Sequence, residues 1–179
     1  ESLHCIMAFS ELYQITENKL FLRALRNMWY SINKYDVHNN GGFSSGEKAT
    51  GNPYDFAAIE SCCTISWIAL SVEMLKLTND STVADALELS TLNSVVGMFS
   101  STGRWSSYNT PMNGEFCSST QHIAFQAREG TSELNCCSVN APRGFGMISD
   151  WAFMKSNNGF VINYYGPSSM SAKLSSENS

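Results

Sequence analysis

The sequence predicts an all-α fold: part of an α/α toroid resembling an (α/α)6 barrel, with a few short strands. Apolar residues recur at helical spacing over four long stretches. Polar breaks group these stretches into two pairs, as in successive helical hairpins. A shift of 62 residues aligns the second pair with the first, placing Leu12 on Met74 and Thr16 on Thr78.

Composition excludes several classes of protein. The chain has 179 residues, 43% hydrophobic and 15% charged, which is typical of a folded domain with a core. A net charge of −5 without a Lys/Arg block argues against a nucleic-acid surface. No apolar run approaches the roughly 20 residues of a membrane span, so no membrane partner is expected. The oligomeric state is left open.

The first hairpin is expected from residues 3–15 and 18–33. Apolar positions such as Leu3, Ile6 and Leu12 recur close to helical spacing. Thr16 or Asn18 can cap the second helix after the break. The chain starts at Glu1 inside this pattern, so we expect it to be a piece of a longer protein.

A Gly-, Asn- and Ser-rich loop is expected over residues 36–54. Its length favours a functional role, and it contains Glu47. The second pair of helices should then cover residues 57–77 and 81–99, separated by residues 78–80. The helical hairpin and the long loop together match the period of the repeat.

The last third is expected to be less regular. Short strands are predicted at residues 105–109 and 123–127, and a fifth helix from near Cys136 to about Met154. Pro142 fits only a first helical turn, so a start nearer Ala141 is also considered. A strand at 160–165 suggests the beginning of a β domain. We therefore predict a partial (α/α)6 domain over 1–158, and a strand and tail leading to a β-sandwich domain over 159–179.

Two Cys-Cys pairs stand out, Cys62-Cys63 and Cys136-Cys137, with Glu60 two residues before Cys62. Three thiolates and one carboxylate form a four-ligand set that suits Zn²⁺. Taken alone, Glu60 is more simply a solvated acid in a first helical turn, with Cys62 and Cys63 as small core residues. Cross-paired disulfides are a third possibility if the chain is secreted.

Spacing constrains how such a site can form. Side chains at i and i+2 do not share a helix face, so Glu60 should lie at or before the first turn of its helix. Cys136 and Cys137 should reach one metal only where the backbone bends before a helix. Reduced thiols suit the cytoplasm or periplasm, but secretion is not excluded, so the compartment is left open.

Several runs resemble glycoside hydrolase family 127, which includes β-L-arabinofuranosidases. They are Glu60–Trp67, Leu75–Asp80, Ala86–Asn93, Tyr108–Met112 and Asn135–Gly144. The resemblance extends from about Gly41 to Gly166. It implies the C-terminal half of an (α/α)6 catalytic domain, followed by β-sandwich modules.

The resemblance also implies roles for individual residues. Zinc would be held by Glu60, Cys62, Cys136 and Cys137, and Cys136 would be the nucleophile of a retaining glycosidase acting on a carbohydrate. Glu47, in a Gly-Glu step after Gly41-Gly42, matches the family's acid/base residue. His4 matches a histidine that the family places in the active site.

Other candidates come from the residues themselves. Tyr108, Asn109 and Trp105 could line a sugar site, and Tyr108 is retained as a substrate-binding candidate beside His4. His38 is expected to be solvated, His122 to lie at a strand edge, and Arg143 to pair with an acid. A helical scaffold with a structural zinc and a redox-active vicinal dithiol remain alternative functions.

Overall fold

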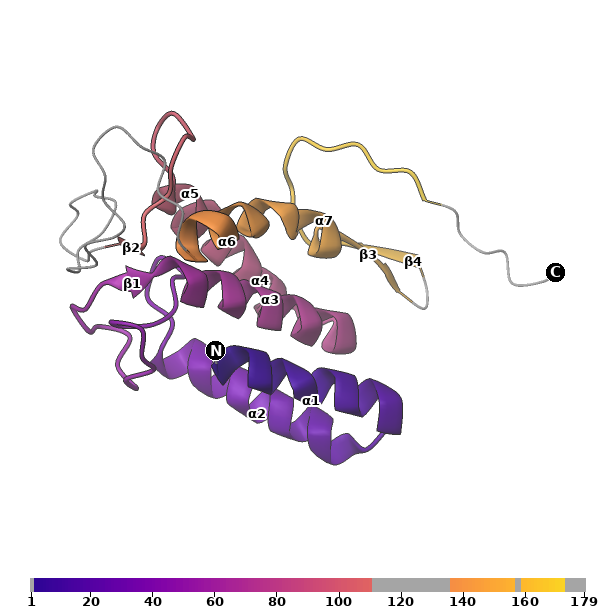
Figure 1. Cartoon of the computed structure of the whole chain (residues 1–179). Coiled ribbons are helices and arrows are strands. Elements are labelled where there is room, and N and C mark those ends of the chain that lie inside the picture. The colour runs from indigo at the N-terminus through magenta and orange to yellow at the C-terminus, as the bar shows by residue number, and fades with distance from the viewer. Residues whose placement is uncertain (1, 111–135, 157–158, 173–179) are drawn as a thin grey trace.

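We analysed a computed structural model, which describes residues 2–110, 136–156 and 159–172. Two helices, α1 (Ser2–Thr16) and α2 (Lys19–Tyr35), form an antiparallel hairpin beneath α3 (Ser61–Thr78). The chain returns through α4 (Ser81–Leu89), the π-helix η1 (Ser90–Val95) and α5 (Val96–Met98). Helices α6 (Cys136–Gly146) and α7 (Ile148–Trp151) then pack on the other side of α3 (Figure 1).

The strands are short. β1 (Ile59–Glu60) pairs with β2 (Asn109–Thr110), and β3 (Phe153–Ser156) pairs with β4 (Gly159–Ile162), both antiparallel. The all-α class is therefore confirmed, and the described helices do not close into a barrel by themselves. The division into domains at residue 158 stays a prediction.

The core surrounds α3, whose sequence is apolar on most sides. Trp67 of α3 stacks on Trp29 of α2 with ring centroids 5.1 Å apart, and both side chains are fully buried. The Trp29 indole N–H donates to Ser71 Oγ at 2.9 Å, which satisfies its buried donor. Packing and a buried hydrogen bond thus hold α3 in place against α2.

The 62-residue repeat is visible in hydrogen bonds at the two helix breaks. Asn18 caps α2 through Leu20 N–H, and Asp80 caps α4 through Thr82 N–H, each at 3.0 Å. Thr16 and Thr78 donate to the carbonyl four residues earlier, and each accepts from the cap residue's N–H. Glu17 and Asn79 both adopt positive φ, 55° and 50°. The two turns are equivalent in conformation.

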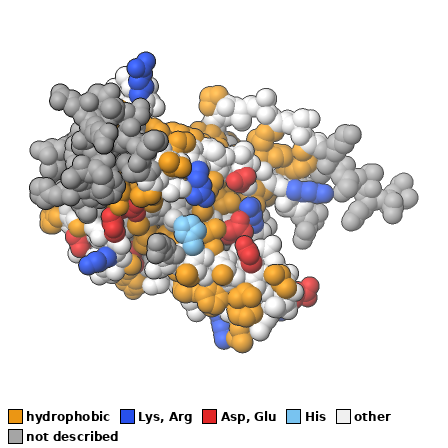
Figure 2. Space-filling model, in the orientation of Figure 1, with side chains coloured by type: hydrophobic (Ala, Val, Ile, Leu, Met, Phe, Trp, Pro, Cys, Tyr) orange, Lys and Arg blue, Asp and Glu red, His pale blue; other side chains and the backbone are white. Residues whose placement is uncertain are grey.

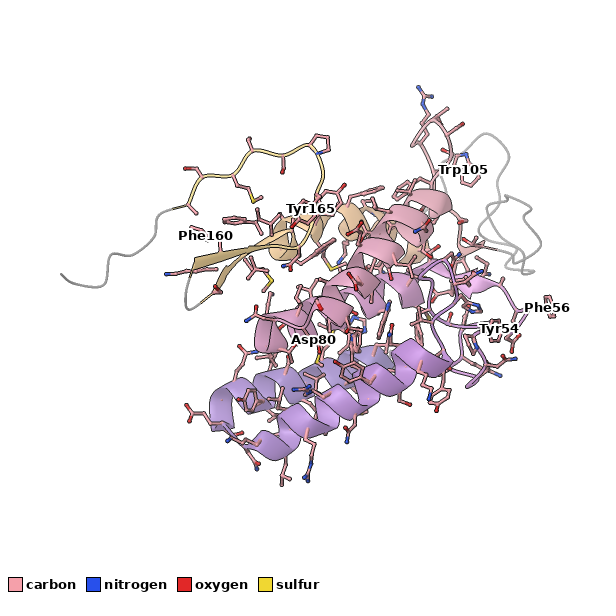
Figure 3. All side chains as sticks on the ribbon, turned by 180° about the vertical axis from the view of Figure 1, so that it is seen from behind. Tyr54, Phe56, Asp80, Trp105, Phe160 and Tyr165 are labelled. Carbon is pink, nitrogen blue, oxygen red and sulfur yellow. The ribbon has the colours of Figure 1, made fainter. Side chains whose placement is uncertain are left out.

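We expect replacement of Asp80 by alanine to destabilise the fold by about 1–2 kcal/mol, because an N-cap is lost. Asp80 lies at the turn between α3 and α4 (Figure 3), and its carboxylate also accepts a hydrogen bond from Tyr30 Oη on α2. Urea unfolding at pH 7 measures the loss. Asp80→Asn is the matched control, because asparagine caps helices equally well.

The same carboxylate gives a pH dependence. The Tyr30 hydrogen bond lowers the pKa of Asp80 in the folded protein. The contribution of the ionised Asp80 carboxylate to the free energy of unfolding is therefore fully present above the unfolded pKa of about 3.9. It is lost as pH falls through the lower pKa of the folded state. The stability difference between wild type and Asp80→Asn should shrink over that interval; a difference that grows on acidification would contradict the assignment.

Several boundaries differ from expectation. Helix α3 begins at Ser61 rather than residue 57. Helix α6 begins at Cys136 with Pro142 inside it, so the alternative start near Ala141 is wrong. The fifth helix does not reach Met154: the helical segment ends at Trp151, and Met154 lies in β3, where Phe153 stacks on Phe160.

The strand predicted at 105–109 is also wrong, since only Asn109 of that stretch belongs to a strand. Asn109 belongs to β2 because its backbone pairs with that of Glu60 in β1. The strand predicted at 160–165 ends at Ile162. The strand at 123–127 and His122 lie outside the described residues.

The face shown in Figure 2 carries acidic and basic side chains interspersed with one another. Hydrophobic side chains gather over the α1–α2 hairpin on that face. Ile15 of α1 and Leu20 of α2 are among the exposed large hydrophobic residues. In the part of the chain that the structure describes, no helix is both long and apolar enough to cross a membrane.

Candidate metal centre and catalytic cleft

Glu60 lies at the junction of β1 and α3 and caps the helix. Its backbone is extended (φ −83°, ψ 128°), and its Oε2 accepts from Cys63 N–H at 2.8 Å. The short β1–β2 ladder holds this junction, and the Ser61 hydroxyl donates to Ser107 O at 2.7 Å. Because Glu60 precedes the helix, its carboxylate can turn toward Cys62, as the two-residue spacing predicts.

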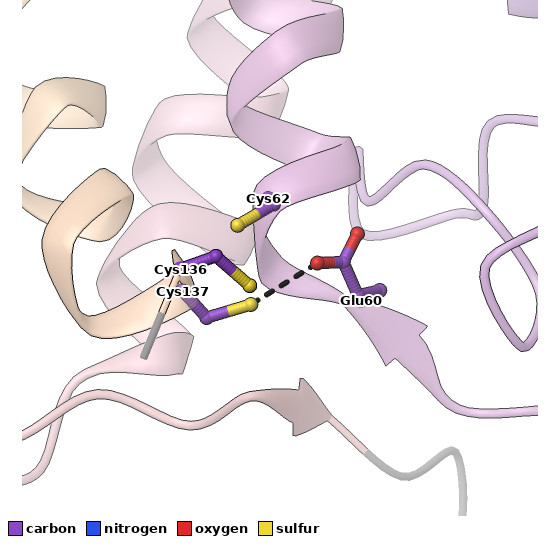
Figure 4. Close-up of side chains that lie close together, drawn as sticks. All are labelled: Glu60, Cys62, Cys136 and Cys137. Atoms are coloured by element: carbon purple, nitrogen blue, oxygen red, sulfur yellow. Dashed lines mark hydrogen bonds between the residues drawn. The ribbon is translucent and has the colours of Figure 1, made fainter. Parts of the chain in front are cut away.

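The second half of the site is the first turn of α6. Cys137 Sγ donates to Glu60 Oε1 at 3.1 Å, and Cys136 lies beside it (Figure 4). Cys137 is fully buried, whereas Cys136 is exposed. The predicted backbone bend between the two cysteines is not needed, because both belong to the helical turn.

One candidate donor atom from each of Glu60, Cys62, Cys136 and Cys137 lies within 4.8 Å of all the others. Glu60 is only 5% exposed, yet no lysine or arginine among the described residues forms an ion pair with it. Burying an unpaired carboxylate among sulfurs is costly unless a cation joins the group. The four side chains therefore fit a metal ion, and three sulfurs with one carboxylate suit a thiophilic divalent ion.

The three thiols differ in pKa when no cation is bound. The neighbouring Cys137 thiol, and then the Asn140 amide that donates to its sulfur, lower the pKa of Cys62. The proximity of Cys62, burial and the Glu60 charge raise the pKa of Cys137. Burial and then the charge of Cys62 raise the pKa of Cys136. A bound cation would reverse these increases, because it favours every thiolate at once.

Asn140 and Arg143 belong to this site although the sequence analysis did not assign them to it. Asn140 Nδ2 donates to Cys62 Sγ at 3.3 Å, and Arg143 Nη1 donates to Asn140 Oδ1 at 2.9 Å. Arg143 thus contacts an amide, and the acid partner predicted for it is not seen among the described ion pairs. Their positions four and seven residues after Cys136 put them on its helix face, which is the signal that could have identified them.

An open cleft of about 690 Å³ lies over the four donors. Its walls include Cys62 and Cys136 as well as His4 from α1 and Glu47 from the long loop. Segments that are far apart in the sequence, α1, the long loop, α3 and α6, therefore meet at one cleft. The predicted catalytic and metal-binding residues all border it except Cys137, which lies buried beneath.

Glu47 is presented by a tight turn. Ser45 and Lys48 form a bridge around Gly46 and Glu47, whose φ values are 56° and 69°. Two successive positive φ values are typical of a type I′ turn, in which a glutamate is unusual and mildly strained. The strained residue is the one that faces the cleft.

A buried histidine, His38, contacts the residues at the start of this turn. His38 is 1% exposed, and its Nε2 lies 3.1 Å from both Ser44 O and Ser45 Oγ. The expectation that His38 is solvated is therefore wrong: the loop folds over it. Gly41 lets the loop approach η1, because a Cβ there would lie 2.6 Å from Ser90, and Ser90 Oγ donates to Gly41 O at 2.8 Å.

Tyr108 connects the turn to the metal-site strands. Its hydroxyl donates to Glu47 Oε1 at 2.8 Å, and its carbonyl accepts from Ser61 N–H. Burial and then the Glu47 hydrogen bond raise the pKa of Tyr108, so it remains a donor at neutral pH. Tyr108 thus fixes the orientation of the Glu47 carboxylate.

Comparison with known proteins agrees with this geometry. A search of curated proteins finds no match. A solved structure, the GH127 beta-L-arabinofuranosidase Ara127N-Se from Geobacillus stearothermophilus T6, superposes with a TM-score of 0.72 at 20% identity. The match covers 91% of this chain and 27% of the other, so the chain spans about a quarter of that protein's length.

Residues 3–150 match the family described as Beta-L-arabinofuranosidase, GH127 catalytic domain. The matched segment includes all four candidate metal ligands together with His4, Glu47 and Tyr108. The chain therefore belongs to the GH127 beta-L-arabinofuranosidase catalytic-domain family.

Proposed function

We propose that this chain carries the catalytic centre of a retaining glycoside hydrolase that acts on β-L-arabinofuranosides or related glycans. The observation that carries the proposal is the position of Glu47 on the same cleft as Cys136 and its neighbouring donors. A nucleophile and a proton donor on one cleft are what glycosyl transfer to water requires.

The proposed cofactor is one zinc ion held by Glu60, Cys62, Cys136 and Cys137. These residues supply the sulfur-rich, four-ligand set that zinc prefers. When bound, zinc would keep the thiols ionised at neutral pH. Buried Cys137 and Glu60 suit a permanent ligand role, whereas exposed Cys136 can reach a substrate.

In the first step, Cys136 Sγ attacks the anomeric carbon and the bond to the leaving oxygen breaks. Glu47 gives its proton to that oxygen, so the aglycone departs as a neutral alcohol. The sugar is then linked to Cys136 through a carbon–sulfur bond. Asn140, which donates to Cys62 Sγ, and Arg143, which donates to Asn140, border the same cleft and could contact the bound sugar.

In the second step, the Glu47 carboxylate takes a proton from water as the water oxygen attacks the anomeric carbon. The carbon–sulfur bond breaks, and Cys136 is restored as a thiolate. Two inversions retain the configuration of the sugar. The centre differs from the usual pair of carboxylates because its nucleophile is a thiolate.

His4 and Tyr108 are the proposed substrate-binding residues. His4 borders the cleft from α1, where its imidazole can bond to a sugar hydroxyl. The Tyr108 hydroxyl is already bonded to Glu47, so it lies where the leaving oxygen would be protonated.

Metal analysis combined with hydrolysis of 4-nitrophenyl β-L-arabinofuranoside tests the proposal. We expect about one zinc ion per chain. Cys137→Ala should lower this to a small fraction, abolish hydrolysis and lower Tm, because a buried ligand is lost. Cys5→Ala, at an exposed cysteine outside the four donors, should change none of the three.

The alternatives predict other results. A scaffold with a structural zinc would bind the metal and unfold without it, but would hydrolyse no glycoside. A vicinal-dithiol redox protein would form a reversible disulfide and bind no metal. Either result would overturn the proposal.

A further inference from the structure

A second cavity, of about 310 Å³, lies between α1, α2, α3 and the long loop. Its walls are mainly apolar side chains, including Leu3, Ile6, Met28, Ile32 and Phe43. Leu3 and Phe43 belong to the buried core, and Ile6 and Ile32 pack against it. The cavity is thus held by the core of the protein.

The cavity meets the catalytic cleft at Glu47. Glu47 borders both spaces, as do Cys63 and Ser66 of the first turns of α3. Among the described residues that line the cavity, it is also the one that carries a charge. A leaving group whose oxygen lies beside the Glu47 carboxylate can therefore extend from the polar cleft into the apolar cavity.

We propose that this cavity binds the aglycone of the substrate, and that the aglycone is an uncharged apolar alcohol, aliphatic or aromatic. The inference rests on the proposed function. The residue that protonates the leaving oxygen must lie beside the leaving group, which puts the aglycone on the Glu47 side. Cys136 takes the sugar on the other side. An apolar lining selects carbon chains over hydroxylated ones.

Chain-length dependence of kcat/KM tests the proposal. Ethyl and pentyl β-L-arabinofuranosides have leaving groups of similar acidity but differ by three CH₂ groups. Each fully buried CH₂ contributes a factor of about four, so three give about 60-fold at full burial. Allowing for partial burial, we expect kcat/KM for the pentyl glycoside to exceed that for the ethyl glycoside by about tenfold or more. The 4-hydroxybutyl glycoside, equal in length to pentyl, should lose most of this advantage because moving its terminal hydroxyl from water into a mainly apolar space costs free energy.

A cavity-filling variant locates the effect. Ala49 is exposed and borders the apolar cavity but not the cleft, so Ala49→Phe should fill part of the space without disturbing the core. We expect the pentyl-to-ethyl ratio of kcat/KM to fall to about two or less. Ala8→Phe is the matched control, at an exposed alanine of α1 that borders neither space, and should leave the ratio unchanged.

The outcomes separate the two proposals. Hydrolysis of all three glycosides at equal kcat/KM would overturn the aglycone site and leave the proposed function standing. A pentyl advantage that survives Ala49→Phe would overturn the assignment to this cavity. Failure to hydrolyse any of the three would overturn the proposed function and the aglycone site together.

Discussion

Replacing Cys136 by alanine is expected to lower kcat/KM for β-L-arabinofuranosides by about 10⁴-fold or more. Removing a catalytic nucleophile typically costs this much, because the remaining groups cannot form the covalent intermediate. Cys136 is exposed, so the loss of its sulfur leaves the packing of α6 on α3 in place. The free energy of unfolding of the metal-free protein should change by less than about 1 kcal/mol.

Steady-state kinetics with urea unfolding of both proteins checks this expectation. Cys5→Ala controls for the general effect of removing an exposed thiol, and should keep full activity. Activity of Cys136→Ala within tenfold of wild type would show that another group attacks the sugar. If Cys136→Ala lost its cooperative urea unfolding as well as its activity, the sulfur would have a structural role instead.

Replacing Glu47 by glutamine is expected to lower kcat by about 10²–10⁴-fold, the usual contribution of a general acid or base. Glutamine has the shape of glutamate but cannot donate a carboxylic proton. The loss in kcat/KM, which reports only the steps up to departure of the leaving group, should be largest for alkyl glycosides and smaller for the 4-nitrophenyl glycoside, whose leaving group departs without a proton. Zinc content should stay near one per chain, because Glu47 is outside the four donors.

Tyr108→Phe is the matched control for this prediction. It removes the 2.8 Å hydrogen bond to Glu47 but keeps the carboxylate. A hydrogen bond to a charged group contributes about 1.5–3 kcal/mol, so activity should fall by about 10–100-fold. A Glu47→Gln variant with equal losses in kcat/KM for alkyl and nitrophenyl glycosides would contradict a proton-donor role.

The sequence was informative where chemistry depends on local spacing. Glu60 and Cys62 are two residues apart, which required the carboxylate to precede its helix, and Glu60 is indeed the N-cap of α3. The cap at Asn18 was predicted for the same reason, and the repeat relates it to Asp80, which the structure shows to be the equivalent cap. Hydrogen bonds within a few residues leave a signature in the sequence.

Other features depend on contacts between distant segments. His38 is buried because the loop folds over its ring, and no periodicity marks a loop that packs inward. The π-helix at Ser90–Val95 lies where the loop backbone approaches it, with Ser94 Oγ donating to Asn40 O at 3.0 Å. Neither residue pattern indicates that the two segments meet.

The start of α6 illustrates a competition between principles. Pro142 suggested a helix beginning near Ala141, because proline lacks the N–H that a helix interior uses. The structure has the helix begin at Cys136 instead, which puts Cys137 against Glu60 and Ala141 in the core. Tertiary packing of this buried face outweighs one missing hydrogen bond.

The most direct test of the central claim is to identify the residue that becomes bonded to the sugar. The zinc-loaded protein is incubated with an epoxide or haloacetamide analogue of L-arabinofuranose, and labelled peptides are mapped by mass spectrometry. We predict one label per chain, on Cys136, and no label at that peptide in Cys136→Ala. A label on Cys62, Cys137 or a carboxylate, with Cys136 unmodified, would contradict the account.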